Sequence, residues 1–119
     1  MKPKKAHHTL SPEAMQLIAK RFKIMGEPMR LQILHALQGG EQTVTELVNT
    51  SQSTQANISK HLALLIQAGL LNRRREGVYV YYFISDPVIF ELCELMCSSI
   101  RNHHEQAQSH LPRQGNRSA

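Results

Sequence analysis

Apolar residues recur along most of this chain three or four residues apart, the spacing of one face of a helix. The pattern predicts helices over residues 12–25, 28–38, 44–48, 54–68 and 87–100. Between the last two helices the period changes, because residues 71–84 combine Val, Tyr and Phe with alternating polar residues. This alternation around Arg75-Glu76-Gly77 predicts a β-hairpin with strands over 71–75 and 78–84.

Residues with strong capping preferences mark where these helices begin and end. Ser, Thr, Asp and Asn favour the position before a helix, Pro favours its first turn, and Gly favours its end. On this basis the expected starts are Ser11-Pro12, Thr43 or Thr45, and Thr54, and the expected ends are Gly26, Gly39-Gly40 and Gly69. The polar stretch 49–53 is expected to be the turn between the third and fourth helices.

The fourth predicted helix has two chemically different faces. Its apolar stripe comprises Ile58, Leu62, Leu65 and Ile66 and is expected to anchor the helix to a core. The opposite polar face is then free to enter a DNA major groove about 12 Å wide. The residues expected to contact DNA are Thr54, Gln55, Asn57, Ser59, Lys60 and His61. Two alternatives stay open at this point: a polar face that is only solvated, and a packing role for His61 beside the hairpin.

The predicted hairpin carries three consecutive arginines that lead into its turn. Arg73 and Arg75 are expected to contact the DNA backbone or the adjacent minor groove, where the guanidinium group suits phosphate. Arg74 is expected on the other face, since side chains alternate along a strand. A helix-turn-helix followed by such a hairpin predicts a mainly α winged helix-turn-helix that binds double-stranded DNA.

Composition and charge agree with a DNA partner. Lys and Arg outnumber Asp and Glu by seven to two in residues 1–30 and by four to one in residues 60–84. The length of 119 residues suits one domain, expected over residues 11–105 between a disordered basic tail, 1–10, and a flexible tail, 106–119. No apolar run approaches a membrane span and no secretory signal is recognised, so a cytoplasmic protein without a membrane partner is expected. No enzyme motif emerges.

Three segments resemble the ArsR/SmtB (arsenic-repressor/metallothionein-repressor) family of transcriptional regulators. They are Met25 to Leu34 at the second helix, Thr54 to Leu62 at the recognition helix, and Arg73 to Tyr82 in the wing. The resemblance covers residues 12–102 and implies a homodimer formed through the terminal helices. It also implies a repressor that leaves its operator when an effector binds. Two-fold symmetry would place the recognition helices about 34 Å apart, so the operator is expected to be an inverted repeat.

Cys93 and Cys97 lie one turn apart on the last predicted helix. Such residues have Cβ atoms about 5–6 Å apart, whereas a disulfide needs about 3.5–4.5 Å. A bridging atom such as arsenic(III) or zinc, or a polysulfide chain, fits this spacing better. Three interpretations stay open: a redox or sulfide sensor, a metal or metalloid sensor, and simple packing, because buried Cys behaves as a small hydrophobe.

The chain departs from known metal sites of the resembled family. Residues 47–50 lack the Cys pair of the arsenic and cadmium type, and Val88 stands where a zinc site would have His. His103 and His104 offer a weaker candidate metal site near the end of the helix. A constitutive DNA-binding or protein-interaction module with structural cysteines therefore remains the alternative to an effector-released repressor.

Overall fold

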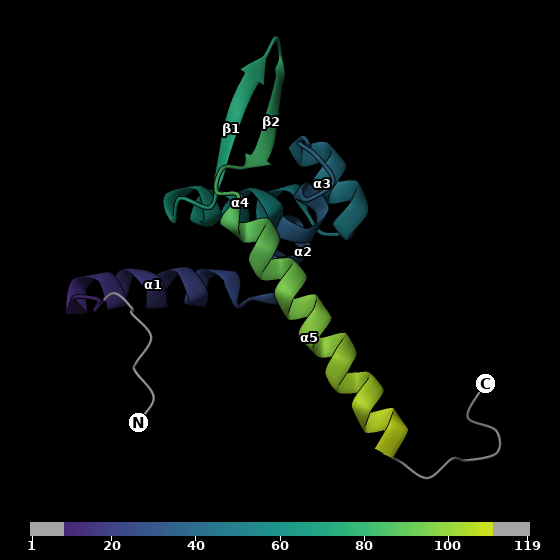
Figure 1. Ribbon diagram of the computed structural model, residues 1–119. Helices are drawn as coiled ribbons and strands as arrows, with labels where there is room; N and C mark the ends of the chain where they lie inside the picture. The colour runs from purple at the N-terminus through teal and green to yellow at the C-terminus, as the bar shows by residue number, and fades with distance from the viewer. Residues whose placement is uncertain (1–8, 111–119) are drawn as a thin grey trace, which may run out of the picture. The chain divides into compact units, whose positions relative to one another are not determined.

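The structure is a computed structural model that describes residues 9–110. The chain divides into two units, one up to Asp86 and one from Pro87. The first unit contains α1 (Pro12–Met25), α2 (Pro28–Leu37), α3 (Val44–Ser51), α4 (Gln55–Gln67), β1 (Leu71–Glu76) and β2 (Tyr79–Ile84), and the second contains α5 (Val88–His110) (Figure 1). This order confirms the predicted winged helix-turn-helix. Residues 106–110 continue α5 instead of forming the predicted tail, and residues 1–8 and 111–119 lie outside the described part.

Side-chain caps define the helix starts, as the sequence predicts. Ser11 and Thr54 each accept a hydrogen bond from the backbone N–H three residues on, at 3.1 Å in both cases. Thr43, and not Thr45, begins α3 through a capping box. Its hydroxyl accepts from the N–H of Glu46 at 3.2 Å, and the Glu46 carboxylate accepts from the N–H of Thr43 at 2.8 Å.

The turn between α3 and α4 is shorter than the predicted 49–53 stretch, because α3 continues to Ser51. Gln52 ends α3 in the left-handed conformation, with φ of 58°. A non-glycine residue in this conformation is uncommon and marks a sharp change of direction. The chain therefore needs only Ser53 and the cap Thr54 before α4 begins.

The hairpin turn lies one residue later than predicted. Glu76 belongs to β1 and pairs with Tyr79, which leaves Gly77 and Val78 as the two turn residues. Gly77 has φ of 63°, as two-residue hairpin turns require. The arginines therefore stand within a strand and not on a projecting loop.

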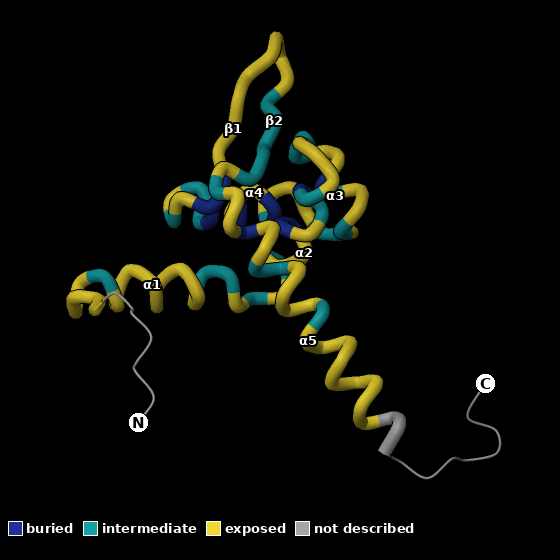
Figure 2. The backbone as a smooth tube through the Cα atoms, in the orientation of Figure 1, coloured by how far each residue is buried: buried dark blue, intermediate teal, exposed yellow. Residues whose placement is uncertain are grey.

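The core of the first unit lies between α2, α3 and α4 (Figure 2). Its buried side chains are Ile33, Leu34, Leu37, Leu47, Ile58, Leu62, Leu65, Leu70 and Leu71. The predicted apolar stripe of α4 is confirmed at Ile58, Leu62 and Leu65, and Ile66 is half-buried. None of the helices in residues 9–110 combines the length and apolar character that a membrane span needs.

An unpredicted contact joins the wing to the segment between α2 and α3. Gln42 and Tyr82 form an antiparallel bridge in which each backbone N–H donates to the other's carbonyl, at 3.1 and 2.8 Å. The Gln42 side chain also donates to the carbonyl of Ala36 at 3.1 Å. The base of the hairpin is therefore held from the α2 side as well as through Leu71 in the core.

Replacing Leu65 with Ala should lower the free energy of unfolding by about 2–5 kcal/mol, because the side chain is fully buried and its loss leaves a cavity. Urea denaturation at one fixed protein concentration measures this change. The exposed Gln67→Ala on the same helix is the matched control and should change stability by less than about 0.5 kcal/mol. Equal effects of the two variants would contradict the assigned core.

Candidate nucleic-acid interface

The first two turns of α4 present polar side chains to solvent. Gln55, Ser59 and Lys60 are exposed, while Ile58 between them is fully buried. The exposed Thr54 uses its hydroxyl oxygen to cap the helix. Burial of Ile58 therefore fixes the rotation of α4 about its axis and directs the polar residues outward.

The side chain of Asn57 is only partly available for contacts with DNA. It is half-buried, and its side-chain amide donates to the hydroxyl of Ser53 at 2.9 Å. This hydrogen bond spans the start of α4 and ties the turn to the helix. One donor of Asn57 is therefore committed to local structure.

His61 is corrected from a DNA-facing residue to a core residue. It is 6% exposed, and its Nδ1 lies 3.1 Å from a guanidinium nitrogen of Arg30. Arginine has no acceptor, so Arg30 donates and Nδ1 accepts. The Nε2 of His61 lies 4.0 Å from the carboxylate of Glu27. Of the two roles considered for His61, the structure therefore supports packing. The polar partners of His61 are Arg30 and Glu27 at the start of α2 and not residues of the wing.

Glu27 completes this contact between α2 and α4. Its carboxylate accepts the backbone N–H of Arg30 at 2.9 Å and caps α2. This hydrogen bond is the main reason why the pKa of Glu27 lies below its usual value, and the positive charge of Arg30 acts in the same direction. The Arg30 side chain also donates to the carbonyl of Ile24, at the end of α1. The polar cluster therefore connects three helices.

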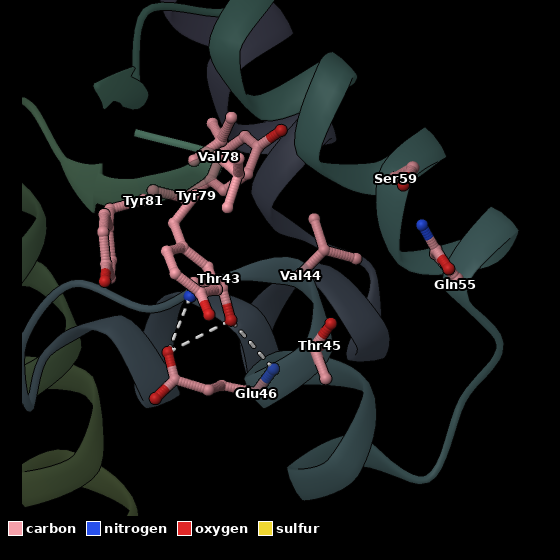
Figure 3. Close-up of a pocket in the computed structure, with 11 residues that line it drawn as sticks. Thr43, Val44, Thr45, Glu46, Gln55, Ser59, Val78, Tyr79 and Tyr81 are labelled. Carbon is pink, nitrogen blue, oxygen red and sulfur yellow. Dashed lines mark hydrogen bonds between the residues drawn. The ribbon is translucent and has the colours of Figure 1, made fainter. Parts of the chain in front are cut away.

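A groove of about 650 Å³ separates α4 from the wing (Figure 3). In Figure 3, Gln55 and Ser59 lie on one side, Val78 and Tyr79 lie on the other, and the first turn of α3 lies between them. The complete lining is Thr43, Val44, Thr45, Glu46, Gln55, Ser59, Val78, Tyr79, Val80, Tyr81 and Tyr82. The lining contains hydroxyl and amide groups but no Lys or Arg, so positive charge comes only from the flanks.

The three wing arginines have different surroundings. Arg74 pairs with Glu41 and Glu76, and its guanidinium carbon lies 4.8 Å from the centre of the Tyr81 ring. Arg73 and Arg75 alternate with Arg74 along β1 and therefore lie on its other face, as predicted. Both are exposed, and within residues 9–110 neither side chain forms an ion pair.

Comparison with known proteins identifies the family. Residues 27–73 match the profile described as "Bacterial regulatory protein, arsR family". An uncharacterised HTH-type transcriptional regulator from Methanocaldococcus jannaschii is 34% identical over 85 residues, which cover 71% of this chain and 96% of that protein. The chain belongs to the ArsR family. It is a DNA-binding transcriptional repressor with a winged helix-turn-helix fold.

Two further similar proteins support this assignment. The arsenical resistance operon repressor of Bacillus subtilis is 30% identical and covers 78% of this chain and 90% of its own length. The solution structure of a homodimeric winged helix-turn-helix domain from Mycobacterium bovis is 28% identical, with a TM-score of 0.73. The similarity covers 84% of this chain and 90% of that domain, so it extends well beyond the helix-turn-helix.

The two cysteines of this ArsR-family chain differ in exposure. Cys93 is half-buried, Cys97 is exposed, and both are free thiols. Burial raises the pKa of Cys93, and the neighbouring Cys97 and Glu94 raise it further. Within the described residues no three His, Cys, Asp or Glu side chains gather into a metal site, and this includes His103 and His104.

The buried contact of His61 predicts a stability effect. His61→Ala should lower the free energy of unfolding by about 1–3 kcal/mol, because it removes the acceptor of a part-buried Arg30 donor. Ser59→Ala, on the exposed face of the same helix, should change it by less than about 0.5 kcal/mol. Thermal and urea unfolding of both variants test this. Equal stabilities would place His61 outside the core.

Proposed function

We propose that the chain binds an inverted-repeat operator as a homodimer and is released by an effector that acts on its thiols. It acts by binding and not by catalysis, in the cytoplasm. The observation that carries this proposal is the exposed polar face of α4, which is held outward by a buried apolar stripe and lies across a groove from the wing.

The proposed DNA contacts follow from exposure and charge. Gln55, Ser59 and Lys60 are exposed on α4 and offer amide, hydroxyl and ammonium groups to base edges and phosphates. Thr54 and the remaining polar atoms of Asn57 lie at the same end of the helix. In the wing, Arg73 and Arg75 are the arginines without an acidic partner among the described residues, so we assign the phosphate contacts to them.

The proposed homodimer follows from apolar surface that each unit leaves exposed. In α1 no residue is buried, and Met15, Leu17 and Phe22 are 57%, 66% and 58% exposed. In α5, Leu95, Met96 and Ile100 are more than 60% exposed. Apolar patches of this kind are typical of protein–protein interfaces. The Mycobacterium bovis domain is a homodimer, and we propose that this chain likewise pairs through its terminal helices.

The DNA contacts predict a steep salt dependence. The wild-type dimer should lose affinity for its operator as salt rises. Lys60→Ala, Arg73→Ala or Arg75→Ala should each weaken binding and reduce the log–log salt slope by about 2, because the dimer loses one phosphate contact in each subunit. Fluorescence anisotropy with DNA from upstream of the protein's own gene measures both quantities. Lys23→Ala on α1 removes the same charge away from the proposed DNA contacts and should leave the salt slope unchanged. A monomer in solution, or binding insensitive to salt, would contradict the proposal.

The proposed effector site comprises Cys93 and Cys97. The related repressor of Bacillus subtilis is named for arsenical resistance, but residues 47–50 of this chain contain no Cys. Two thiols of one chain are fewer than the four ligands of a structural zinc site. They also leave an arsenic(III) centre incomplete. Metal or metalloid binding would therefore need the cysteines of the second chain, whereas a redox or sulfide reaction would need only one chain.

The pKa of Cys93 predicts an order of reaction. Because that pKa is raised, Cys93 is largely a protonated thiol near neutral pH, and only the thiolate is nucleophilic. We expect the exposed Cys97 to react first, and the rate at Cys93 to rise as pH increases through its raised pKa. Mass spectrometry after alkylation at several pH values measures both rates.

The proposed effector site also predicts release from DNA. Exposure to arsenite, zinc, peroxide or polysulfide should release the wild-type protein from DNA but not the variant with both Cys93→Ser and Cys97→Ser. Equal release of the two proteins would leave both cysteines as packing residues and favour a repressor without a thiol effector.

A further inference from the structure

Arg74 differs from its two neighbours because its hydrogen-bonding groups already have partners. Its Nε donates to one carboxylate oxygen of Glu41 at 2.9 Å, and a terminal nitrogen donates to the other oxygen. The second terminal nitrogen donates to Glu76 at 2.6 Å. One face of the guanidinium lies over the Tyr81 ring. Carboxylates therefore occupy two of the hydrogen-bonding edges of the Arg74 guanidinium group.

The path of this side chain crosses the wing. In the sheet β2 pairs with β1 on one edge and with Gln42 on the other, so Glu41 and β1 lie on opposite sides of β2. Neighbouring strands are about 4.8 Å apart. Arg74 starts on β1 directly opposite Tyr81, extends over that ring and reaches Glu41 beyond it. The side chain thus connects the outer strand of the wing to the loop between α2 and α3.

The charges of this cluster explain why Arg74 is a poor phosphate ligand. Two carboxylates neutralise one guanidinium, and the three groups together carry a net charge of −1. Pairing with Arg74 lowers the pKa of Glu41, and pairing with both carboxylates raises the pKa of Arg74, so Glu41 and Arg74 both remain ionised near neutral pH. A DNA phosphate would have to displace a bidentate carboxylate before it could bind here.

We infer that Arg74 is a positioning residue, which, through Glu41 and Tyr81, holds the wing at a fixed angle to the helix-turn-helix and does not itself contact DNA. This inference rests on the proposed DNA-binding function. The Gln42–Tyr82 bridge beside it is a single pair of hydrogen bonds. Leu71 is the only fully buried residue of the two strands; the rest of β1 is exposed, and residues 80–84 of β2 are half-buried. Beyond Leu71 the wing therefore has no fully buried side chain to define its direction.

The inference predicts an unusual effect of Glu41→Gln. Removal of a negative charge from a DNA-binding surface ordinarily strengthens binding. If Glu41 instead serves to hold Arg74, the variant should weaken operator binding by about two- to fivefold, as expected for an exposed ion pair. Arg74→Gln should weaken binding by a similar factor, and the double variant by no more than the larger single effect. Neither variant should change the salt slope.

Arg73→Gln is the matched control, since it removes the same charge from the adjacent position on the other face of β1. It should weaken binding and lower the salt slope by about 2, one contact from each subunit of the dimer. Tighter binding by Glu41→Gln, together with a slope lowered by about 2 in Arg74→Gln, would overturn the inference. That result would make Arg74 a phosphate contact for which Glu41 competes.

A second measurement needs no DNA. Amide hydrogen exchange at Gln42 and Tyr82, followed by NMR in the free dimer, should be faster in Glu41→Gln and Arg74→Gln than in wild type, because the wing base opens more often. Arg73→Gln should exchange like wild type. Unchanged exchange in the first two variants would overturn the positioning role. If the wild type failed to bind any operator DNA, the proposed function would fail, and this exchange measurement would still decide the role of Arg74.

Discussion

The rest of the structure depends on the burial of one side of α4. Ile58, Leu62 and Leu65 are fully buried, and burial of such side chains stabilises a fold by about 1.5–3 kcal/mol each. Surface polar contacts contribute much less, so the apolar stripe decides how the helix is rotated. Once the apolar stripe is buried, the polar residues on the opposite face of α4 point toward solvent. DNA recognition in this protein is thus a consequence of core packing.

The wing is held by a different kind of interaction. Leu71 is the only fully buried residue of the two strands, so full hydrophobic burial is confined to the base of the hairpin. The Gln42–Tyr82 bridge at the base and the ion pairs of Arg74 above it add directional contacts. Directional hydrogen bonds suit this task because they depend on geometry more strongly than apolar contacts do. The two elements that we propose to face DNA are therefore positioned by separate physical means.

The wing contains three arginines, but only two of them carry a positive charge that is not paired with a carboxylate of the described residues. Arg74 is surrounded by Glu41 and Glu76, whereas Arg73 and Arg75 have no ion-pair partner in the described part of the chain. The groove beside the wing is lined by neutral groups and by Glu46. Positive charge is consequently confined to the flanks of this groove, where it favours a duplex that lies across the groove and not a small anion within it.

The sequence by itself determined the order of the elements, the caps at Ser11 and Thr54, the buried stripe of α4 and the family. These features depend on neighbouring residues, and helical or strand periodicity reveals them. Only the tertiary structure decided which polar side chains remain free. The buried His61 is hydrogen-bonded to Arg30, 31 residues away, and Arg74 is paired with Glu41, 33 residues away. Such partners are brought together by folding, and no local pattern contains them.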